Sequence, residues 1–150
     1  MASPRNGGVV SPSGTHPWQV ASAVPSGGYL LKDTTTAATR GVHGFKKDLC
    51  GAGEEPCGFS FTGNNHPVSG AARTNEMVGV CPLEDGMIVD FPISDTNEEI
   101  TLGAELETAA GGLVTIKDGA GWIVGKAIEA VDINTGGYVR AVVGKVYRAA

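Results

Sequence analysis

The hydrophobic residues of this chain fall into short segments separated by turns rich in Gly, Pro, Asn and Asp. Apolar and polar positions alternate within several segments, and Val, Ile and aromatic residues are frequent, which is typical of strands. The 23 Gly and 8 Pro leave little room for long helices. The pattern predicts an all-β fold, a small β-barrel or sandwich. The expected strands are Tyr29–Lys32, Cys57–Thr62, Met77–Cys81, Met87–Ile93, Ile100–Glu107, Leu113–Lys117, Trp122–Val131 and Tyr138–Tyr147.

The segment Trp122–Val131 fits two kinds of element. Its apolar residues Ile123, Val124, Ala127, Ile128 and Val131 recur with the period of an amphipathic helix. However, Gly125 in the middle and four β-branched residues disfavour a helix. We expect a strand that bends at Gly125.

The last expected strand, Tyr138–Tyr147, is apolar on both faces. One face can pack on the core, and the other is too apolar to lie in water along its whole length. We therefore expect the second face to contact another protein or another copy of the chain. The candidate subunit-interface residues are Tyr138, Val142, Val143 and Val146.

Residues 1 to 26 have Pro and Gly every few positions and only scattered apolar residues. Such a segment predicts an extended N-terminal arm, followed by a β domain from 27 to 150. A disordered tail is the alternative, although Trp18 is costly to leave in water. The candidate contact residues of the arm are Val9, Val10, Trp18 and Val20.

The two halves of the β domain show a similar order of motifs. "GYLLKD", "CGFSFTG" and "MVGVC" in the first half resemble "GAELET", "VGKAIEA" and "VRAVV" in the second. This order is consistent with an internal duplication, although recurring β-propensity alone would also produce it.

Composition and charge narrow the classes of function. The formal charge is −5 and no basic run exceeds Lys46-Lys47, which disfavours nucleic acid as a partner. No apolar stretch reaches 18 residues, so we expect no membrane partner and a soluble protein made inside the cell. Three Cys cannot all pair within the chain, which favours a reducing compartment.

Candidate catalytic and metal-binding residues form no recognisable pattern. Cys50, Cys57, Cys81, His43 and His66 could supply zinc ligands, but the C-x6-C spacing is not that of a zinc knuckle. The alternative for Cys50 and Cys57 is a loop with two ordinary thiols that can oxidise. No Ser lies in a G-x-S-x-G elbow, and the paired acids lie in turn-like positions typical of solvated surface. We expect no catalytic residues, no metal and no cofactor.

One region resembles a known family. Residues 100 to 143, "ITLGAELETAAGGLVTIKDGAGWIVGKAIEAVDINTGGYVRAVV", resemble the C-terminal half of the head decoration (cement) proteins of tailed bacteriophages. The shared features are Ile100, Gly103 and Leu106, the turn Asp118-Gly119, "VGKAIEAVD" and "VRAVV". Residues 28 to 93 match more loosely, and the insertions "CGAGEEPCG" and "FPISDTNEE" depart from the family pattern.

The resemblance implies a compact β-tulip-like protein on the outer surface of an assembled phage capsid. It also implies a homotrimer, the major capsid protein as partner, and an arm that lies on the shell. Two other classes stay open: a β-barrel that binds a small molecule or glycan through Trp18, Trp122 and Tyr138, and an enzyme with a Cys-dependent site.

Overall fold

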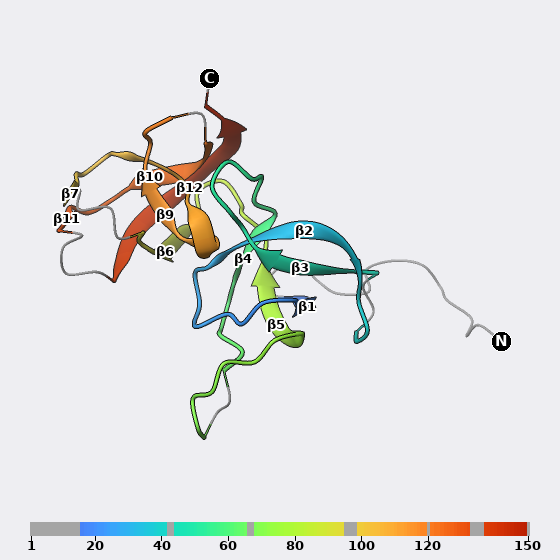
Figure 1. The fold of residues 1–150 in the computed structure, drawn as a ribbon. Coiled ribbons are helices and arrows are strands. Elements are labelled where there is room, and N and C mark those ends of the chain that lie inside the picture. Colours follow the sequence, from blue (N-terminus) through green and yellow to red (C-terminus); the bar gives the residue numbers. More distant parts are fainter. Residues whose placement is uncertain are drawn as a thin grey trace.

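The computed structural model describes residues 16–41, 44–65, 68–94, 99–119, 121–132 and 137–149. These residues form an all-β fold in which the only helical element is a 3-10 turn at Ala110–Gly112 (Figure 1). None of their helices is long and apolar enough to cross a membrane. The strands are β1 His16–Val20, β2 Leu30–Ala37, β3 Phe45–Leu49, β4 Gly58–Ser60, β5 Glu76–Cys81, β6 Ile88–Pro92, β7 Glu99–Ile100, β8 Glu105–Thr108, β9 Val114–Ile116, β10 Trp122–Ala127, β11 Val131–Asp132 and β12 Tyr138–Arg148.

The first half of the chain is a closed five-stranded barrel with the strand order β1-β3-β2-β4-β5. Neighbouring strands are antiparallel except for β1 and β3, which run parallel and close the barrel where Val20 pairs with Lys47. Closure leaves no free sheet edge in this half, which removes a route to edge-to-edge aggregation.

The second half is a curled five-stranded sheet with the order β6-β12-β10-β8-β9. A single parallel bridge between Ile93 and Val114 joins the end of β6 to β9. The short strands β7 and β11 pair with each other beside this sheet.

The two halves have the same connectivity. Strands β1 to β5 correspond in order to β6, β8, β9, β10 and β12, and every pairing of the first half recurs in the second with the same direction. The parallel β1–β3 closure corresponds to the parallel bridge between Ile93 and Val114. The motif order that suggested a duplication therefore follows three equivalent neighbouring strands in each half.

The halves share one hydrophobic core. The larger cluster joins residues of the barrel, such as Leu30 and Phe59, to residues of the curled sheet, such as Phe91 and Leu106. The Phe59 and Phe91 rings meet edge to face with centroids 6.3 Å apart. A smaller cluster around Val20 fills the barrel itself.

Strand β10 resolves the ambiguous segment in favour of a strand. It pairs on both sides, with β8 and β12, and its register shifts between Ile123 and Gly125 in both pairings. A β-carbon at Gly125 would lie 2.3 Å from the carbonyl oxygen of Val142. The predicted bend at Gly125 is thus a bulge that only glycine fits, because the neighbouring main chain occupies the space of a side chain.

We expect Gly125→Ala to lower the free energy of unfolding by about 1–3 kcal/mol, the usual cost of overpacking a close contact. Urea unfolding followed by circular dichroism measures this effect. Gly144→Ala in β12 is the matched control, since a β-carbon at Gly144 meets no atom within 4 Å. Equal destabilisation by the two substitutions would contradict the proposed close contact.

The structure corrects the predicted arm. Residues 16–20 are β1. Val20 at the end of β1 and Val24 in the following segment are both fully buried, so residues 16–26 belong to the β domain. The prediction failed because Pro and Gly recur every few positions in this segment, yet β1 accommodates Pro17 at its second residue. Residues 1–15, including Val9 and Val10, lie outside the described part of the chain.

Two other differences concern strand boundaries. Strand β3 was not expected because "FKKDL" is mainly charged, yet Lys47 lies inward and is nearly buried. The expected strand Ile100–Glu107 is two strands, β7 and β8, separated by a turn in which Gly103 has a positive φ of 84°.

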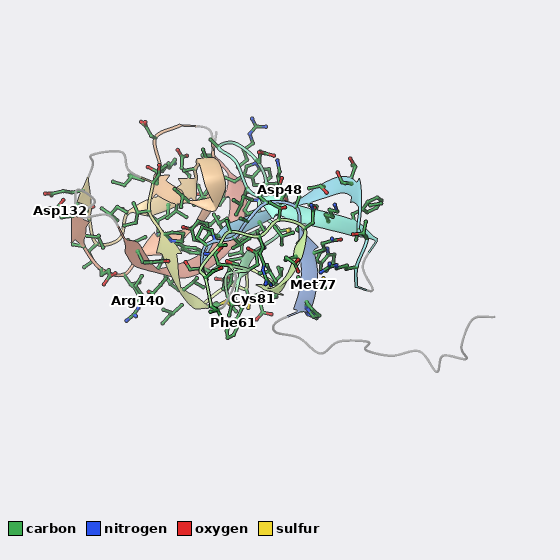
Figure 2. All side chains as sticks on the ribbon, turned by 60° about the horizontal axis from the view of Figure 1, so that its bottom comes forward. Asp48, Phe61, Met77, Cys81, Asp132 and Arg140 are labelled. Carbon is green, nitrogen blue, oxygen red and sulfur yellow. The ribbon has the colours of Figure 1, made fainter. Side chains whose placement is uncertain are left out.

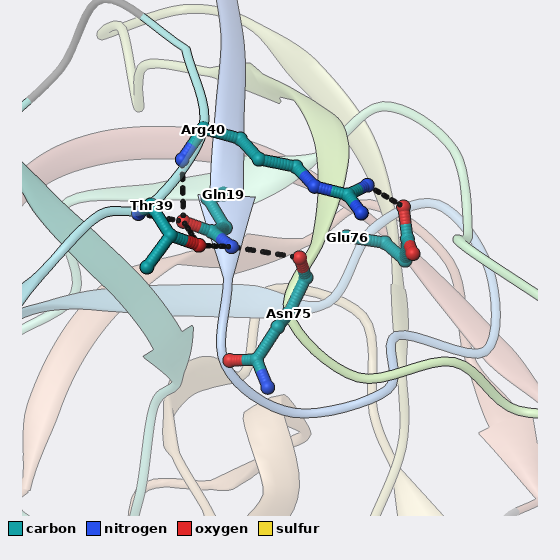
Figure 3. Close-up of polar contacts among 5 residues, drawn as sticks. All are labelled: Gln19, Thr39, Arg40, Asn75 and Glu76. Carbon is teal, nitrogen blue, oxygen red and sulfur yellow. Dashed lines mark hydrogen bonds and ion pairs between the residues drawn. The ribbon is translucent and has the colours of Figure 1, made fainter.

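A buried glutamine attaches a barrel loop to β1 (Figure 3). Gln19 Nε2 donates to the carbonyl oxygen of Asn75 at 2.8 Å and to Thr39 Oγ1 at 3.0 Å. Its Oε1 accepts from the main-chain amides of Thr39 at 2.7 Å and Arg40 at 3.3 Å. Gln19 is only 1% exposed, so these bonds replace the water that its amide would otherwise bind.

Candidate interaction surface

A shallow apolar groove of about 590 Å³ lies where the barrel meets the curled sheet. Three large apolar side chains line it and are well exposed: Phe61 at 62%, Ile88 at 62% and Tyr138 at 44%. Phe61 and Cys81 of the first half and Arg140 of β12 lie along the same edge of the molecule in Figure 2. The complete lining is Ser26, Gly27, Gly28, Phe59, Ser60, Phe61, Cys81, Met87, Ile88, Val89, Asp90 and Tyr138.

The floor of the groove is formed by the main chain of Gly27 and Gly28. A β-carbon at Gly27 would lie 2.6 Å from the carbonyl oxygen of Phe61, and one at Gly28 would lie 2.2 Å from that of Asp90. Gly28 also has a positive φ of 87°. The sequence needs glycine at both positions: Gly27 lies against the main chain of Phe61 within the barrel half, and Gly28 lies where the barrel and the sheet approach each other at main-chain distance.

The wall of the groove continues onto the outer face of β6 and β12. Cross-strand pairing aligns Ile88 with Val142 and Asp90 with Arg140. Arg140 binds Asp90 with two hydrogen bonds, Nε to Oδ1 at 2.9 Å and Nη2 to Oδ2 at 3.1 Å. This bidentate pair holds the pKa of Asp90 below its usual value. The outer face therefore alternates apolar side chains with a fixed ion pair.

The predicted interface residues of β12 are divided between two environments. Tyr138 is exposed at the groove, where its hydroxyl contacts Ser26 Oγ, and Val142 and Val146 are half-buried. Val143 is fully buried in the shared core, so its assignment to a subunit interface is wrong. The reason is the alternation of the strand, which turns Val139, Ala141 and Val143 inward together.

The predicted contact residues of the arm also differ in environment. Val20 is fully buried inside the barrel, so it cannot contact a capsid. Trp18 is half-buried at the end of the barrel, where its indole Nε1 donates to the carbonyl oxygen of Phe45 at 2.7 Å. Neither residue is part of an extended arm.

Lys47 lies at the centre of a polar cluster at this end of the barrel. Its Nζ is 2.6 Å from Asp33 Oδ1, 3.2 Å from Cys57 Sγ and 4.0 Å from the centre of the Trp18 ring. Burial raises the pKa of the Cys57 thiol despite the opposing effect of Lys47. A protonated thiol is a poor nucleophile, so the cluster is better suited to closing the barrel than to covalent catalysis.

Cys50, Cys57 and Cys81 are thiols and form no disulfide. Burial raises the pKa of Cys50 to about 12. His43 and His66 lie outside the described residues, within which no three His, Cys, Asp or Glu side chains are grouped to hold a metal ion.

The raised pKa of Cys50 predicts a pH effect on stability. The folded protein keeps the proton that the unfolded chain loses near pH 9, so this stabilisation is complete below pH 9 and is lost as the pH rises towards about 12. We expect the free energy of unfolding to fall more steeply between pH 9 and 11 in the wild type than in Cys50→Ala, by at most about 1.4 kcal/mol per pH unit. Urea unfolding at several pH values measures both slopes, and equal slopes would contradict the prediction.

The aromatic residues considered for a ligand site do not come together. Trp122 pairs with Arg148 at one end of β12, whereas Tyr138 is at the other end, about 30 Å away for a strand of this length. Trp18 belongs to the end of the barrel. The three residues therefore line no common site.

The sequence pattern predicted only one of the three exposed apolar residues that line the groove. Tyr138 was expected at an interface, but Phe61 and Ile88 were not singled out. Ile88 could have been noticed as an apolar residue on the same face of its strand as Asp90. Phe61 is exposed because β4 ends at Ser60, which the sequence pattern did not show.

Comparison with models of protein families, with curated proteins and with solved structures gave no match to this chain.

Proposed function

We propose that this chain is a capsid decoration (cement) protein of a tailed-bacteriophage head, a structural protein of the virion that binds the outer surface of the assembled shell. The observation that carries the proposal is the groove, where Phe61, Ile88 and Tyr138 present exposed apolar surface on a folded chain. Clustered exposed apolar side chains of this size are typical of protein interfaces. Residues 100 to 143 resemble the cement proteins, and this resemblance is the reason for proposing a phage capsid as the partner.

The groove is suited to adhesion for two physical reasons. Its floor is main chain that makes two close contacts at glycine positions. The groove therefore loses little conformational entropy when a partner binds. Its rim combines apolar side chains with the Asp90–Arg140 pair, which can fix the orientation of a partner through charge. The proposed partners are the major capsid protein and further copies of the chain, assembled as a homotrimer.

The proposed contacts with the shell are the groove and the segment 1–15, in which Val9 and Val10 are the apolar pair. The Val142 and Val146 side of β12 is the proposed contact between copies, since both residues are half-buried in the single chain. Sedimentation equilibrium of the purified chain distinguishes a 15.3 kDa monomer from a trimer.

The test is co-sedimentation with a panel of undecorated, expanded heads of tailed bacteriophages. We expect the wild-type chain to pellet with a subset of the heads and the double variant Phe61→Ser/Ile88→Ser to bind at least about 100-fold more weakly, because each large apolar side chain is worth about 1.5–3 kcal/mol when buried. Leu102→Ser is the matched control, since Leu102 is 72% exposed and lies outside the groove lining.

Two outcomes would overturn the proposal. Failure of the wild-type chain to bind any head would remove the decoration role. Equal loss of binding in the Leu102→Ser control would show that the groove is not the contact surface.

A further inference from the structure

We propose that the groove binds a short extended segment of a partner protein, which adds as a strand to the free edge of β6. This inference goes beyond the decoration role, because it names the form of the occupant and holds whether or not the partner is a capsid protein.

The main-chain groups of β6 point alternately to two sides. The amide of Val143 in β12 donates to the carbonyl oxygen of Met87 at 2.7 Å, which makes Met87 a hydrogen-bonded position. Such positions recur at every second residue of an antiparallel strand, so Val89 also bonds β12. The amides and carbonyls of Ile88 and Asp90 therefore point to the opposite side, away from β12.

The opposite side of β6 is a sheet edge that opens into the groove. Strand β9 reaches β6 only at the bridge between Ile93 and Val114. Among the residues that the structure describes, the amide and carbonyl of Ile88 and the amide of Asp90 have no main-chain partner on this side. Ile88 and Asp90 both line the groove. Two donors and one acceptor are thus ready to pair with an extended chain.

The proline in β6 agrees with a free edge. Pro92 lies at the next alternate position after Asp90, so its missing N–H costs no hydrogen bond to β12. Within sheets, proline is confined to edge strands, strand starts and bulges, because it cannot donate to a neighbouring strand.

The barrel limits the length of the occupant. A β-carbon at Gly28 would lie 2.2 Å from the carbonyl oxygen of Asp90, so no strand fits between these two residues at the usual spacing of about 4.8 Å. Towards Met87, the edge continues along the groove lining. The added segment therefore pairs with Ile88 and ends beside Asp90.

The groove also selects the side chains of the occupant. Successive side chains of an added strand point to opposite faces of the sheet. One set would lie beside Ile88, which is 62% exposed, and the other would face the apolar lining at Val89 and Cys81. Main-chain hydrogen bonds would supply affinity and these apolar contacts would supply selectivity, so we expect adjacent apolar residues in the occupant.

The first measurement is amide hydrogen exchange of the full-length free chain, followed by NMR. We expect the amides of Ile88 and Asp90 to exchange at least about 100-fold faster than those of Val89 and Phe91, which bond β12. Equal protection at all four amides would show that the edge is already covered and would overturn the proposal.

The second measurement uses a yeast-displayed library of short random peptides as the probe. We expect the selected peptides to be rich in adjacent apolar residues and, when bound, to slow exchange at Ile88 and Asp90 while leaving Leu102 unchanged. Protection at alternate residues distinguishes strand addition from a contact of side chains only. A library without binders, or binders that protect neither amide, would overturn the proposal. The test uses no capsid, so its failure and that of the decoration role are separate results.

Matched variants at one position isolate the main-chain donor. Ile88→Pro removes the outward N–H and keeps the pairing with β12, whereas Ile88→Ala removes a similar part of the side chain and keeps the N–H. We expect the selected peptides to bind Ile88→Pro about tenfold more weakly than Ile88→Ala. Equal affinities, with an unchanged circular dichroism spectrum in both variants, would contradict pairing at this edge.

Discussion

Val143→Asp is expected to remove a large part of the free energy of unfolding at 25 °C. Val143 is fully buried in the core that joins the two halves. A carboxylate placed there has no cation to pair with on the inward face of β12, where its neighbours are Val139 and Ala141. The cost is at least about 4 kcal/mol, a large part of the 5–15 kcal/mol that stabilises a typical domain.

Val142→Asp is the matched control for this prediction. Val142 is the neighbouring residue, is half-buried, and faces outward beside Ile88 and Lys126. We expect this variant to fold and to lose less than about 2 kcal/mol, with any larger effect confined to self-association. Circular dichroism with thermal and urea unfolding measures both variants. A Val143→Asp protein that unfolds like the wild type would refute the assignment of Val143 to the core.

The second large effect is expected at Gln19. Gln19→Leu removes five hydrogen bonds and leaves the carbonyl oxygen of Asn75 and the amide of Thr39 without their side-chain partner. The partners belong to exposed residues, so water can replace some of these bonds; at a net value of about 0.5–1.5 kcal/mol for each hydrogen bond, we expect a total loss of about 2–4 kcal/mol. The measurement is the free energy of unfolding in urea.

Gln19→Glu distinguishes the hydrogen bonds that the Gln19 amide donates from those that it accepts. Glutamate keeps an oxygen for the Thr39 and Arg40 amides but places a second oxygen opposite the carbonyl of Asn75, so it should also destabilise the barrel. Arg40→Ala is the control, because it removes only the exposed ion pair between Arg40 and Glu76 and should cost less than about 1 kcal/mol. If Gln19→Leu left the free energy of unfolding unchanged, the segments around Thr39 and Asn75 would be held by other contacts.

The groove and the proposed decoration role are linked through the duplicated architecture. Two five-stranded units of the same connectivity pack on one core, and the groove forms at their junction. A single unit would have neither the contact of Gly28 with Asp90 of the second half nor the facing walls of Phe61 and Ile88. The candidate site is therefore a property of the paired units.

The sequence by itself determined the fold class and most of the strands. The spacing of apolar segments and turns indicated an all-β chain, because an alternating strand buries one face whatever its partner is. It also favoured a strand with a bend at Gly125 within Trp122–Val131, since β-branched residues and a central glycine are local preferences, and the structure has this strand at Trp122–Ala127. These features depend on residues that are close together in the chain.

Only the tertiary structure decided which strands are neighbours and which side chains remain exposed. Strand β1 exists because β5 and β3 pair with a segment whose own preferences are weak, and Lys47 is buried because Asp33, Cys57 and Trp18 surround it. The groove joins Phe61, Ile88 and Tyr138, which are 27 and 50 residues apart along the chain. Long-range pairing sets such positions, and local periodicity contains no information about it.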